Sequence, residues 1–201
     1  MATTAAPYGL RPVNLIGGRP YAGAVRHIKI ASGYAANIYN GSVVKIVADG
    51  VIEIVLDDGS AADPFVAGTV GVFVGCSYTN SDGQYINRNY WPTGTIASDA
   101  KAHVVDDPNA LFMIQADGAV PQTALGANSH LAAVQSTSTG STVTGNSTSA
   151  LSASNVATTD GDCFRIIDFV ESSTSTVGDA YTDVIVKFNH IAHSYTNPTG
   201  I

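Results

Sequence analysis

Short apolar runs separated by turn residues fill the chain from residue 26 onward. Residues 26–30 alternate polar and apolar side chains, and residues 42–47 are rich in β-branched ones. Asp49-Gly50 leads from that run into residues 51–56, and a turn pair of this type between β-prone runs is typical of a two-residue hairpin turn. We expect further strands at residues 69–78, 84–90, 102–105, 111–115, 131–134, 164–170 and 184–189.

Two further features refine this pattern. Gly71 and Gly75 lie inside the longest apolar run and indicate a β-bulge or a close backbone approach. The chain has no convincing amphipathic helix, and a single helical turn is expected near residues 121–125. Strands at this spacing predict a mainly β protein, an antiparallel β-sandwich or barrel of jelly-roll-like type.

Residues 1–25 break the strand pattern. Pro7, Pro12 and Pro20 fall within them, and proline removes a backbone donor, so neither a helix nor a central strand is expected there. We predict an extended N-terminal arm over residues 1–25 and a single β-rich domain over residues 26–201. Because the arm is rich in apolar side chains, we expect it to lie on another protein surface; these side chains are Tyr8, Leu10, Val13, Leu15, Ile16 and Tyr21.

A Ser/Thr-rich stretch interrupts the domain at residues 135–159. Fourteen of its twenty-five residues are Ser or Thr, a composition typical of low-complexity linkers. The stretch also keeps Val143, Leu151 and Val156 as apolar positions. We therefore expect a surface excursion, extended and hydrogen-bonded through its hydroxyls; a flexible linker is the alternative.

Charge is strongly segregated along the chain. The first 48 residues contain five basic residues and no acidic one, whereas the remainder contains sixteen acidic residues against four basic ones. The leading segment therefore carries about +5 and the body about −12, within a net charge of −7. Such segregation bears on association rather than on fold. It suggests that the two ends face different partners, or that the head of one copy meets the body of another.

Composition favours a protein that packs into an assembly. Hydrophobic residues make up 45% of the 201 residues, enough for a real core, but charged residues make up only 12%, about half the usual share. Cys76 and Cys163 lie far apart in apolar stretches, so two buried free thiols are expected, with one disulfide as the alternative. The sequence shows no apolar run of membrane-spanning length and no signal peptide. Synthesis and folding in a cytoplasm are therefore expected.

Sequence motifs for catalysis or cofactor binding do not occur. Glycine-rich nucleotide loops, the G-x-S-x-G elbow and H-E-x-x-H are all missing. The five histidines are scattered, and His190 and His193 fall on opposite faces if they lie in a strand, so structural roles are expected for them. Asp57-Asp58-Gly59 and Asp160-Gly-Asp162 fit tight turns better than calcium loops. We predict no enzymatic activity, no cofactor and no bound metal.

A nucleic-acid partner is not expected. Five positive charges over forty-eight residues are sparse for nucleic acid, and the acidic body would repel phosphates. Trp91, within Tyr90-Trp-Pro92, is the only tryptophan and is expected either in a core corner or at an interface.

Several stretches resemble the small structural proteins of tailed-phage heads. They are residues 5–12, 41–45, 69–75, 90–92, 106–112 and 178–184. The family is that of the capsid decoration (cement) proteins, which sit on the outside of the shell and clamp neighbouring major capsid protein subunits. The resemblance implies a β-rich body, oligomerisation as a dimer or trimer on the shell, location on the exterior of the virion capsid, and no catalysis. The residues themselves predict no nucleic-acid or membrane partner.

The sequence therefore predicts a structural protein that binds the outer surface of a phage capsid and stabilises the shell by bridging subunits. The expected partner-binding residues are Tyr8, Leu10, Arg11, Val13, Leu15, Arg19, Tyr21, Arg26 and Trp91. One alternative is a virion protein of the tail or adhesion apparatus, motivated by the Ser/Thr-rich stretch. Another is a carbohydrate-binding β-sandwich that uses an exposed Trp91.

Overall fold

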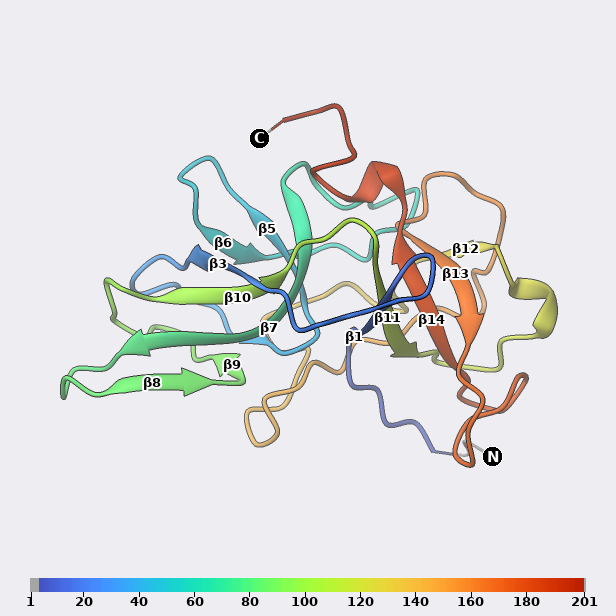
Figure 1. The fold of residues 1–201 in the computed structure, drawn as a ribbon, viewed down its shortest axis with the longest axis horizontal. Helices are drawn as coiled ribbons and strands as arrows, with labels where there is room; N and C mark the ends of the chain where they lie inside the picture. The colour runs from blue at the N-terminus through green and yellow to red at the C-terminus, as the bar shows by residue number, and fades with distance from the viewer. Residues whose placement is uncertain (1–3, 201) are drawn as a thin grey trace.

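Two six-stranded antiparallel sheets and a two-stranded one organise the chain, of which the computed structural model describes residues 4–200 (Figure 1). Sheet A has the order β12-β13-β14-β11-β1-β2, with strands Asn128–Ser129, Phe164–Phe169, Asp183–Phe188, Ala110–Gln115, Arg11–Leu15 and Arg19–Pro20. Sheet B has the order β3-β10-β7-β5-β6, with strands Arg26–Lys29, Lys101–Val105, Thr69–Thr79, Val43–Ile46 and Ile52–Ile54. In addition, β8 (Tyr85–Arg88) pairs with β7, and β4 (Ile38–Tyr39) pairs with β9 (Tyr90–Trp91).

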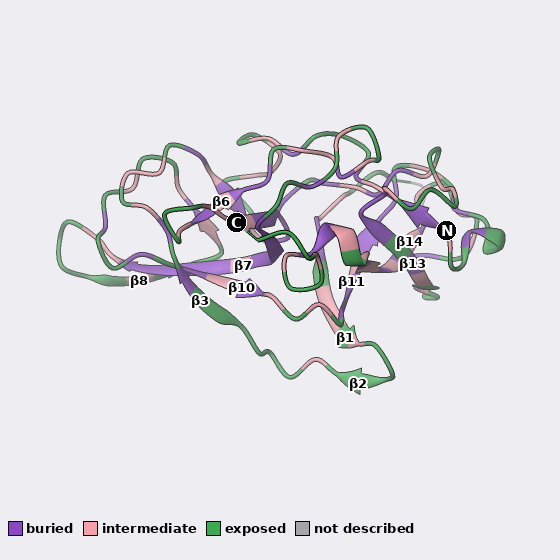
Figure 2. Cartoon of the chain, turned by 90° about the horizontal axis from the view of Figure 1, so that it is seen from above, coloured by how far each residue is buried: buried purple, intermediate pink, exposed green. Residues whose placement is uncertain are grey.

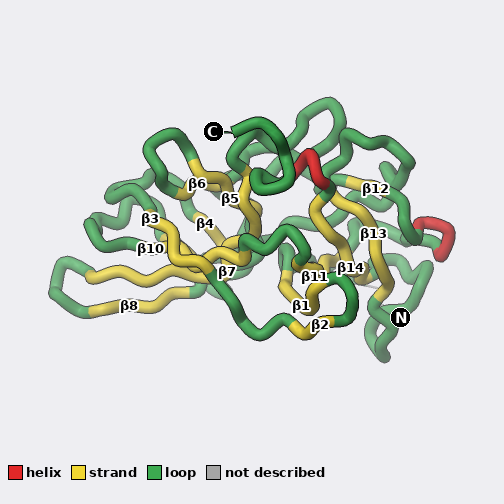
Figure 3. Tube along the Cα trace, turned by 45° about the horizontal axis from the view of Figure 1, so that its top comes forward, coloured by secondary structure: helices red, strands yellow, loops and turns green. Residues whose placement is uncertain are grey.

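The sheets enclose two hydrophobic cores. The first core lies where sheet A meets one face of sheet B, and Phe112, Phe164 and Phe188 of sheet A pack there with Val72 of β7. The second core fills the other face of sheet B, which is covered by residues 30–38 and by the β4–β9 pair. An isolated bridge between Ile30 and Ile52 joins the two outer strands of sheet B, so this sheet curls around the second core. The prediction of a mainly β, sandwich-like fold is confirmed, and Figure 3 shows strands throughout both halves of the molecule.

Most predicted strands form close to their predicted bounds. The hairpin around Asp49-Gly50 is confirmed as β5–β6, but its loop contains three residues, because Val47 still pairs with Val51 through a hydrogen bond from its amide. Gly50 adopts a φ of +71°, the left-handed conformation that closes three-residue hairpin loops. The helical turn near residues 121–125 is confirmed as η1 (Gln122–Ala124).

Two expectations about local structure are wrong. Residues 131–134 form no strand, since only Leu131 makes an isolated bridge, with Leu151. A second short helix, η2 (His190–Ala192), follows β14 and was not predicted. Within residues 4–200 both helices are single 3-10 turns, and none of the described helices is long and apolar enough to cross a membrane.

The bulge predicted in the longest run is confirmed in β7. The register against β10 shifts opposite Gly75, and the register against β5 shifts near Gly71. A Cβ atom on Gly71 would lie 2.0 Å from the carbonyl oxygen of Val105. A side chain at this position would therefore collide with the backbone of β10, so glycine is needed for the strands to approach.

The predicted arm is the main correction to the fold. Residues 11–15 form β1, which pairs with β11 on one side and β2 on the other, and is therefore an inner strand of sheet A. Leu10 is fully buried in the first core. Pro12 is tolerated because the register shifts between Pro12 and Asn14, a bulge that removes the need for a proline donor. Residues 1–3 of the predicted arm lie outside the described part.

The Ser/Thr-rich stretch is packed along the body. Gln135 is buried, and its side chain accepts a hydrogen bond from the amide of Val43 (2.9 Å) and donates one to the carbonyl of Val55 (3.1 Å). Leu151 is fully buried and bridges both Ala116 and Leu131. The serines and threonines of residues 135–159 hydrogen-bond to the backbone and to other side chains of the stretch. Residues 135–159 are thus an ordered excursion rather than a flexible linker.

Candidate interaction surface

What remains of the predicted arm is a shorter segment that projects from the body. The projecting segment, residues 16–25, contains the β1–β2 turn, β2 and the connection to β3, and Figure 2 shows it as a mostly exposed extension beyond the sheets. Ile16 is 46% exposed and Val25 is 36% exposed. Arg19 is exposed as well and makes no ion pair within residues 4–200. An exposed mixture of aliphatic and cationic side chains on an extended backbone is typical of a docking segment.

The backbone of the projecting segment also has free donors. Within the described chain, the amides of residues 22–25 donate no hydrogen bond to another residue. These residues lead directly into β3, whose one ladder partner is β10, on the inner side of sheet B. Gly23 adopts a φ of +78°, so this stretch is not a regular strand, and its unpaired amides are donors available to the backbone of another chain. Tyr21 anchors this segment, since its ring packs on the first core and its hydroxyl donates to the carbonyl of Ala24 (3.1 Å).

Four other predicted partner-binding residues are held against the body. Tyr8 donates a hydrogen bond from its hydroxyl to Asp183 (2.9 Å), and Arg11 stacks over the Tyr8 ring at 4.3 Å. Burial raises the pKa of the Tyr8 hydroxyl, and the negative charge of Asp183 raises it further. Burial likewise raises the pKa of Asp183, opposed by the Tyr8 hydrogen bond and by Arg11. Val13 and Leu15 are half-buried in β1.

Trp91 lies in the second core and is completely buried. Its ring packs edge-on against Tyr78 with centroids 5.4 Å apart, and its indole nitrogen donates to the carbonyl of Tyr34 (3.5 Å). The core alternative for this residue is therefore correct, and the expected partner-binding role of Trp91 is wrong. The same burial makes Leu10 a core residue rather than an interface anchor.

Folding neutralises much of the charge segregation seen along the sequence. Arg26 forms an ion pair with Asp106 (3.2 Å) and also donates to the hydroxyl of Tyr195, which itself donates to Asp106 (2.9 Å). Burial and the Asp106 hydrogen bond raise the pKa of Tyr195 to about 12. Lys45 lies directly opposite Glu53 across the β5–β6 hairpin. Few of the leading positive charges therefore remain unopposed.

Four basic side chains share one outward face of sheet B, a group that the sequence did not reveal. Lys29 lies opposite Lys101 and His27 lies opposite His103 across the β3–β10 pair. The two imidazole rings stack with centroids 4.5 Å apart, and His103 contacts the hydroxyl of Ser77 at 3.2 Å. The alternation of residues 26–30 indicated the face of each side chain, but no local signal gave the pairing partner seventy-odd residues away.

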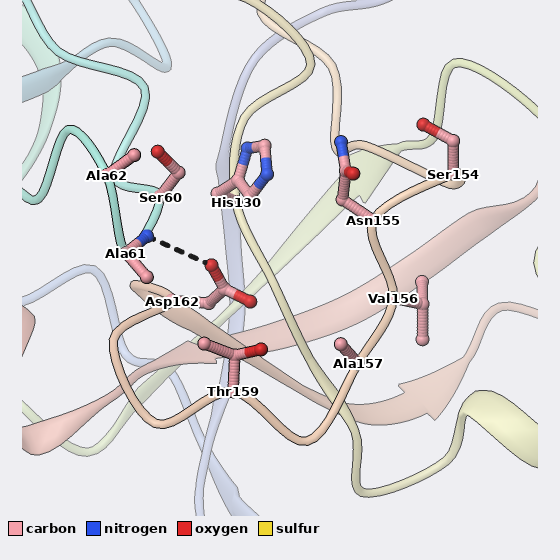
Figure 4. Close-up of a pocket in the computed structure, with 10 residues that line it drawn as sticks. All are labelled: Ser60, Ala61, Ala62, His130, Ser154, Asn155, Val156, Ala157, Thr159 and Asp162. Carbon is pink, nitrogen blue, oxygen red and sulfur yellow. Dashed lines mark hydrogen bonds between the residues drawn. The ribbon is translucent and has the colours of Figure 1, made fainter.

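The molecule also has an open pocket of about 470 Å³ between residues 60–62, His130 and residues 154–162, lined by both polar and apolar side chains (Figure 4). Its two groups suited to acid–base chemistry are engaged by the backbone. One oxygen of Asp162 accepts a hydrogen bond from the Ala61 amide (3.3 Å), and His130 Nδ1 contacts the Leu131 carbonyl (2.8 Å). These contacts give both side chains a structural role in holding the surrounding loops.

The remaining candidate ligands are structural. Within residues 4–200 no group of three His, Cys, Asp or Glu side chains is placed to hold a metal. His193 is buried against Phe188 and Tyr195, and burial lowers the pKa of its imidazole. Cys76 and Cys163 are buried free thiols, which confirms the expectation; burial raises the pKa of Cys76 to about 12 and also raises that of Cys163.

No family model matches the chain, and neither a curated protein nor a solved structure matches it.

Proposed function

We propose that this protein is a structural component of a virion, a decoration protein that binds the outer surface of a phage capsid and bridges major capsid protein subunits. The observation that carries the proposal is the projecting segment, which exposes aliphatic side chains together with an arginine and backbone amides that have no partner among residues 4–200. Buried pockets and reactive side chains suited to catalysis are not needed for such a role, because its effect is mechanical. Binding that occurs only to the assembled shell raises the free energy needed to separate its subunits.

The projecting segment replaces the whole 1–25 arm as the proposed docking element. Leu10 is buried in the first core, and β1 is paired on both sides within sheet A, so this stretch has no free sheet edge for a partner strand. The free amides of residues 22–25 can donate to the backbone of a partner chain, and Ile16 and Val25 can bury aliphatic surface on it. Tyr21 keeps the segment close to its bound geometry, which lowers the entropy lost on docking.

The other two functions receive less support. A carbohydrate-binding role depended on an exposed Trp91, and that ring is fully buried. A tail or adhesion role was motivated by the Ser/Thr-rich stretch, and in the structure residues 135–159 are an ordered excursion packed on the body. We therefore keep the capsid exterior as the proposed location and a dimer or trimer as the proposed state on the shell. Synthesis in the host bacterial cytoplasm is part of the same proposal.

The test compares matched substitutions on shells that lack the protein. Ile16→Asp with Arg19→Glu places negative charge on the projecting segment, whereas Val143→Asp with Arg165→Glu makes the same changes at exposed positions elsewhere. We expect the first variant to remain folded and to lose attachment to shells in co-sedimentation, and the second to attach like the native chain. Equal attachment of the two variants would refute docking through residues 16–25.

A functional measurement completes the test. Shells carrying the native protein should release packaged DNA at a higher temperature than bare shells or shells incubated with the first variant. An unchanged release temperature with native protein attached would contradict stabilisation and leave attachment alone.

A further inference from the structure

The basic quartet on sheet B, Lys29, Lys101, His27 and His103, has an arrangement that the fold itself does not require. Each lysine faces a lysine and each histidine faces a histidine directly across the β3–β10 ladder. Like charges directly opposite one another on a sheet destabilise it, and threonine or valine would suit an outward strand position better. The four side chains occur at alternating positions of two neighbouring strands, so they form one compact face.

Acidic neighbours do not neutralise this face. Within residues 4–200 neither lysine of the quartet makes an ion pair. One carboxylate close to Lys101 is that of Asp99. The Thr79 hydroxyl and amide donate to it (2.6 and 3.0 Å) and are the main cause of its lowered pKa, and Lys101 lowers that pKa further. At the other end of β3, Asp106 is engaged by Arg26 and Tyr195. The remaining neighbour across β10 is uncharged: Ser77 on β7 contacts His103.

We propose that the basic quartet binds an extended acidic segment of the partner protein, with carboxylates at alternating positions. Successive quartet positions along a strand are two residues apart, about 6.6–6.8 Å, and alternate side chains of an extended peptide repeat at the same spacing. One carboxylate of the peptide then lies beside Lys29 and Lys101, and the next lies beside the stacked rings of His27 and His103. Charge-assisted hydrogen bonds from the two lysines to the first carboxylate favour this pairing, and His103 adds one to the second carboxylate when its ring is protonated.

The position of the quartet connects it with the projecting segment. Residues 16–25 lead into β3, which carries His27 and Lys29, so one partner chain can contact both surfaces in succession. As applied to a capsid subunit, this inference rests on the proposed function, but binding of an acidic peptide can be measured without any shell.

Binding should strengthen at acidic pH. Burial and the neighbouring His27 lower the pKa of His103, which keeps this ring neutral near pH 7 in the free protein. A carboxylate placed beside His103 favours the protonated form of that ring, so binding takes up a proton and tightens as the pH falls. Asp99, near Lys101, and Asp106, paired with Arg26, are carboxylates close to this face in the free protein.

The experiment titrates the full chain with a ten-residue peptide that alternates aspartate with threonine. Calorimetry at low salt measures the affinity of the peptide. The peptide with asparagine in place of aspartate is the matched ligand control. We expect Lys29→Gln with Lys101→Gln to weaken binding roughly tenfold, as the loss of two exposed charge pairs predicts. Lys45→Gln with Arg165→Gln removes the same charge elsewhere and should leave binding unchanged. Lys29→Arg with Lys101→Arg should retain it.

A second variant isolates the histidines. His27→Gln with His103→Gln should abolish the increase in affinity between pH 7.5 and pH 5.5, and thermal unfolding of each variant checks that the fold is kept. Equal binding of the aspartate and asparagine peptides, or native affinity in the Lys29→Gln and Lys101→Gln variant, would overturn the proposal. Tighter binding of single-stranded DNA than of the peptide would also overturn the proposal. So would salt-sensitive self-association of the protein that requires the quartet and prevents the peptide from binding.

The outcome is separable from that of the proposed function. If shells bind but the peptide does not, only the role of the quartet fails. If the peptide binds through the quartet but shells never bind, the proposed capsid function fails and the acidic-segment site stands.

Discussion

Replacing Leu10 with alanine separates a core residue from a docking residue in the part of the chain that was predicted to be an arm. Leu10 is completely buried in the first core, and its amide donates to the carbonyl of Gly41 (3.0 Å). A leucine truncated at such a site loses its transfer free energy and leaves a cavity, which together cost about 2–5 kcal/mol. We expect about 3 kcal/mol here, because Gly9 and Gly41 pack closely beside it and leave the backbone little room to collapse.

That loss is large enough to measure directly. For a chain of about 200 residues, 1 kcal/mol corresponds to about 2–4 °C in Tm, so Leu10→Ala should lower Tm by roughly 6–12 °C. Ile16→Ala is the matched control, because Ile16 lies six residues away and is 46% exposed; it should change Tm by about 2 °C or less. Urea titration at neutral pH gives the free energies of unfolding, and calorimetry gives the melting temperatures.

The variant with the larger defect should be the other one when attachment to shells is measured below the unfolding transition. Leu10→Ala should attach like the native chain, whereas Ile16→Ala should attach more weakly. Two results would refute this reasoning. One is a stability loss under about 1 kcal/mol for Leu10→Ala, and the other is a stability loss for Ile16→Ala that matches it.

Three further outcomes follow from buried groups. Burial depresses the pKa of His193 below its unfolded value of about 6.5. The contribution of the neutral His193 to stability is therefore complete above pH 6.5 and declines as the pH falls below that value. Urea titrations at pH 7.5 and 5.5 should show this decline, and His193→Gln should make the decline smaller. Gly71→Ala should lower the free energy of unfolding by roughly 2–4 kcal/mol, because its Cβ would meet the Val105 carbonyl at 2.0 Å. Gly17→Ala, whose Cβ would have no atom within 4 Å, should lower it by about 1 kcal/mol. Similar melting temperatures for the two variants would contradict the close approach at Gly71. Cys76 and Cys163 should react with a thiol reagent only on unfolding, since both are buried and their pKa values are raised; rapid modification of the native protein would show otherwise.

The strands of sheet B were predictable because their signals are local. Alternation, β-branched residues and the glycine of the Asp49-Gly50 pair lie within a few residues of one another, and they define β5, β6 and β7 closely. The length of the hairpin loop was less predictable, because the three-residue form depends on the φ of Gly50 and on the pairing of Val47 with Val51. Both follow from the register, which is a property of the folded pair.

β1 could not be identified in the same way, since its assignment depends on a partner about one hundred residues away. Pro12 argues against an inner strand by its chemistry alone. The structure accommodates it by shifting the β1–β11 register between Pro12 and Asn14, and a bulge of this type is set by the partner strand. The location of Trp91 was difficult to predict for a related reason, because a large apolar ring with one N–H donor suits either a core or an interface. Its burial is decided by the curl of sheet B and by its contact with Tyr78.

The charge pattern of the sequence takes on a different meaning once the chain is folded. Arg26 is paired with Asp106, Lys45 faces Glu53, and Arg11 lies over Tyr8 close to Asp183. Arg19 and Lys29 remain, on the projecting segment and on the quartet respectively. Docking through residues 16–25 must therefore draw mostly on aliphatic burial and strand pairing, which salt affects little, whereas docking through the quartet is electrostatic and screened by salt. If both surfaces contact one partner, raising the salt concentration should first remove the contribution of Lys29 and Lys101 and leave a weaker attachment that still depends on Ile16. An attachment that disappears completely with salt would assign the binding energy to the quartet alone.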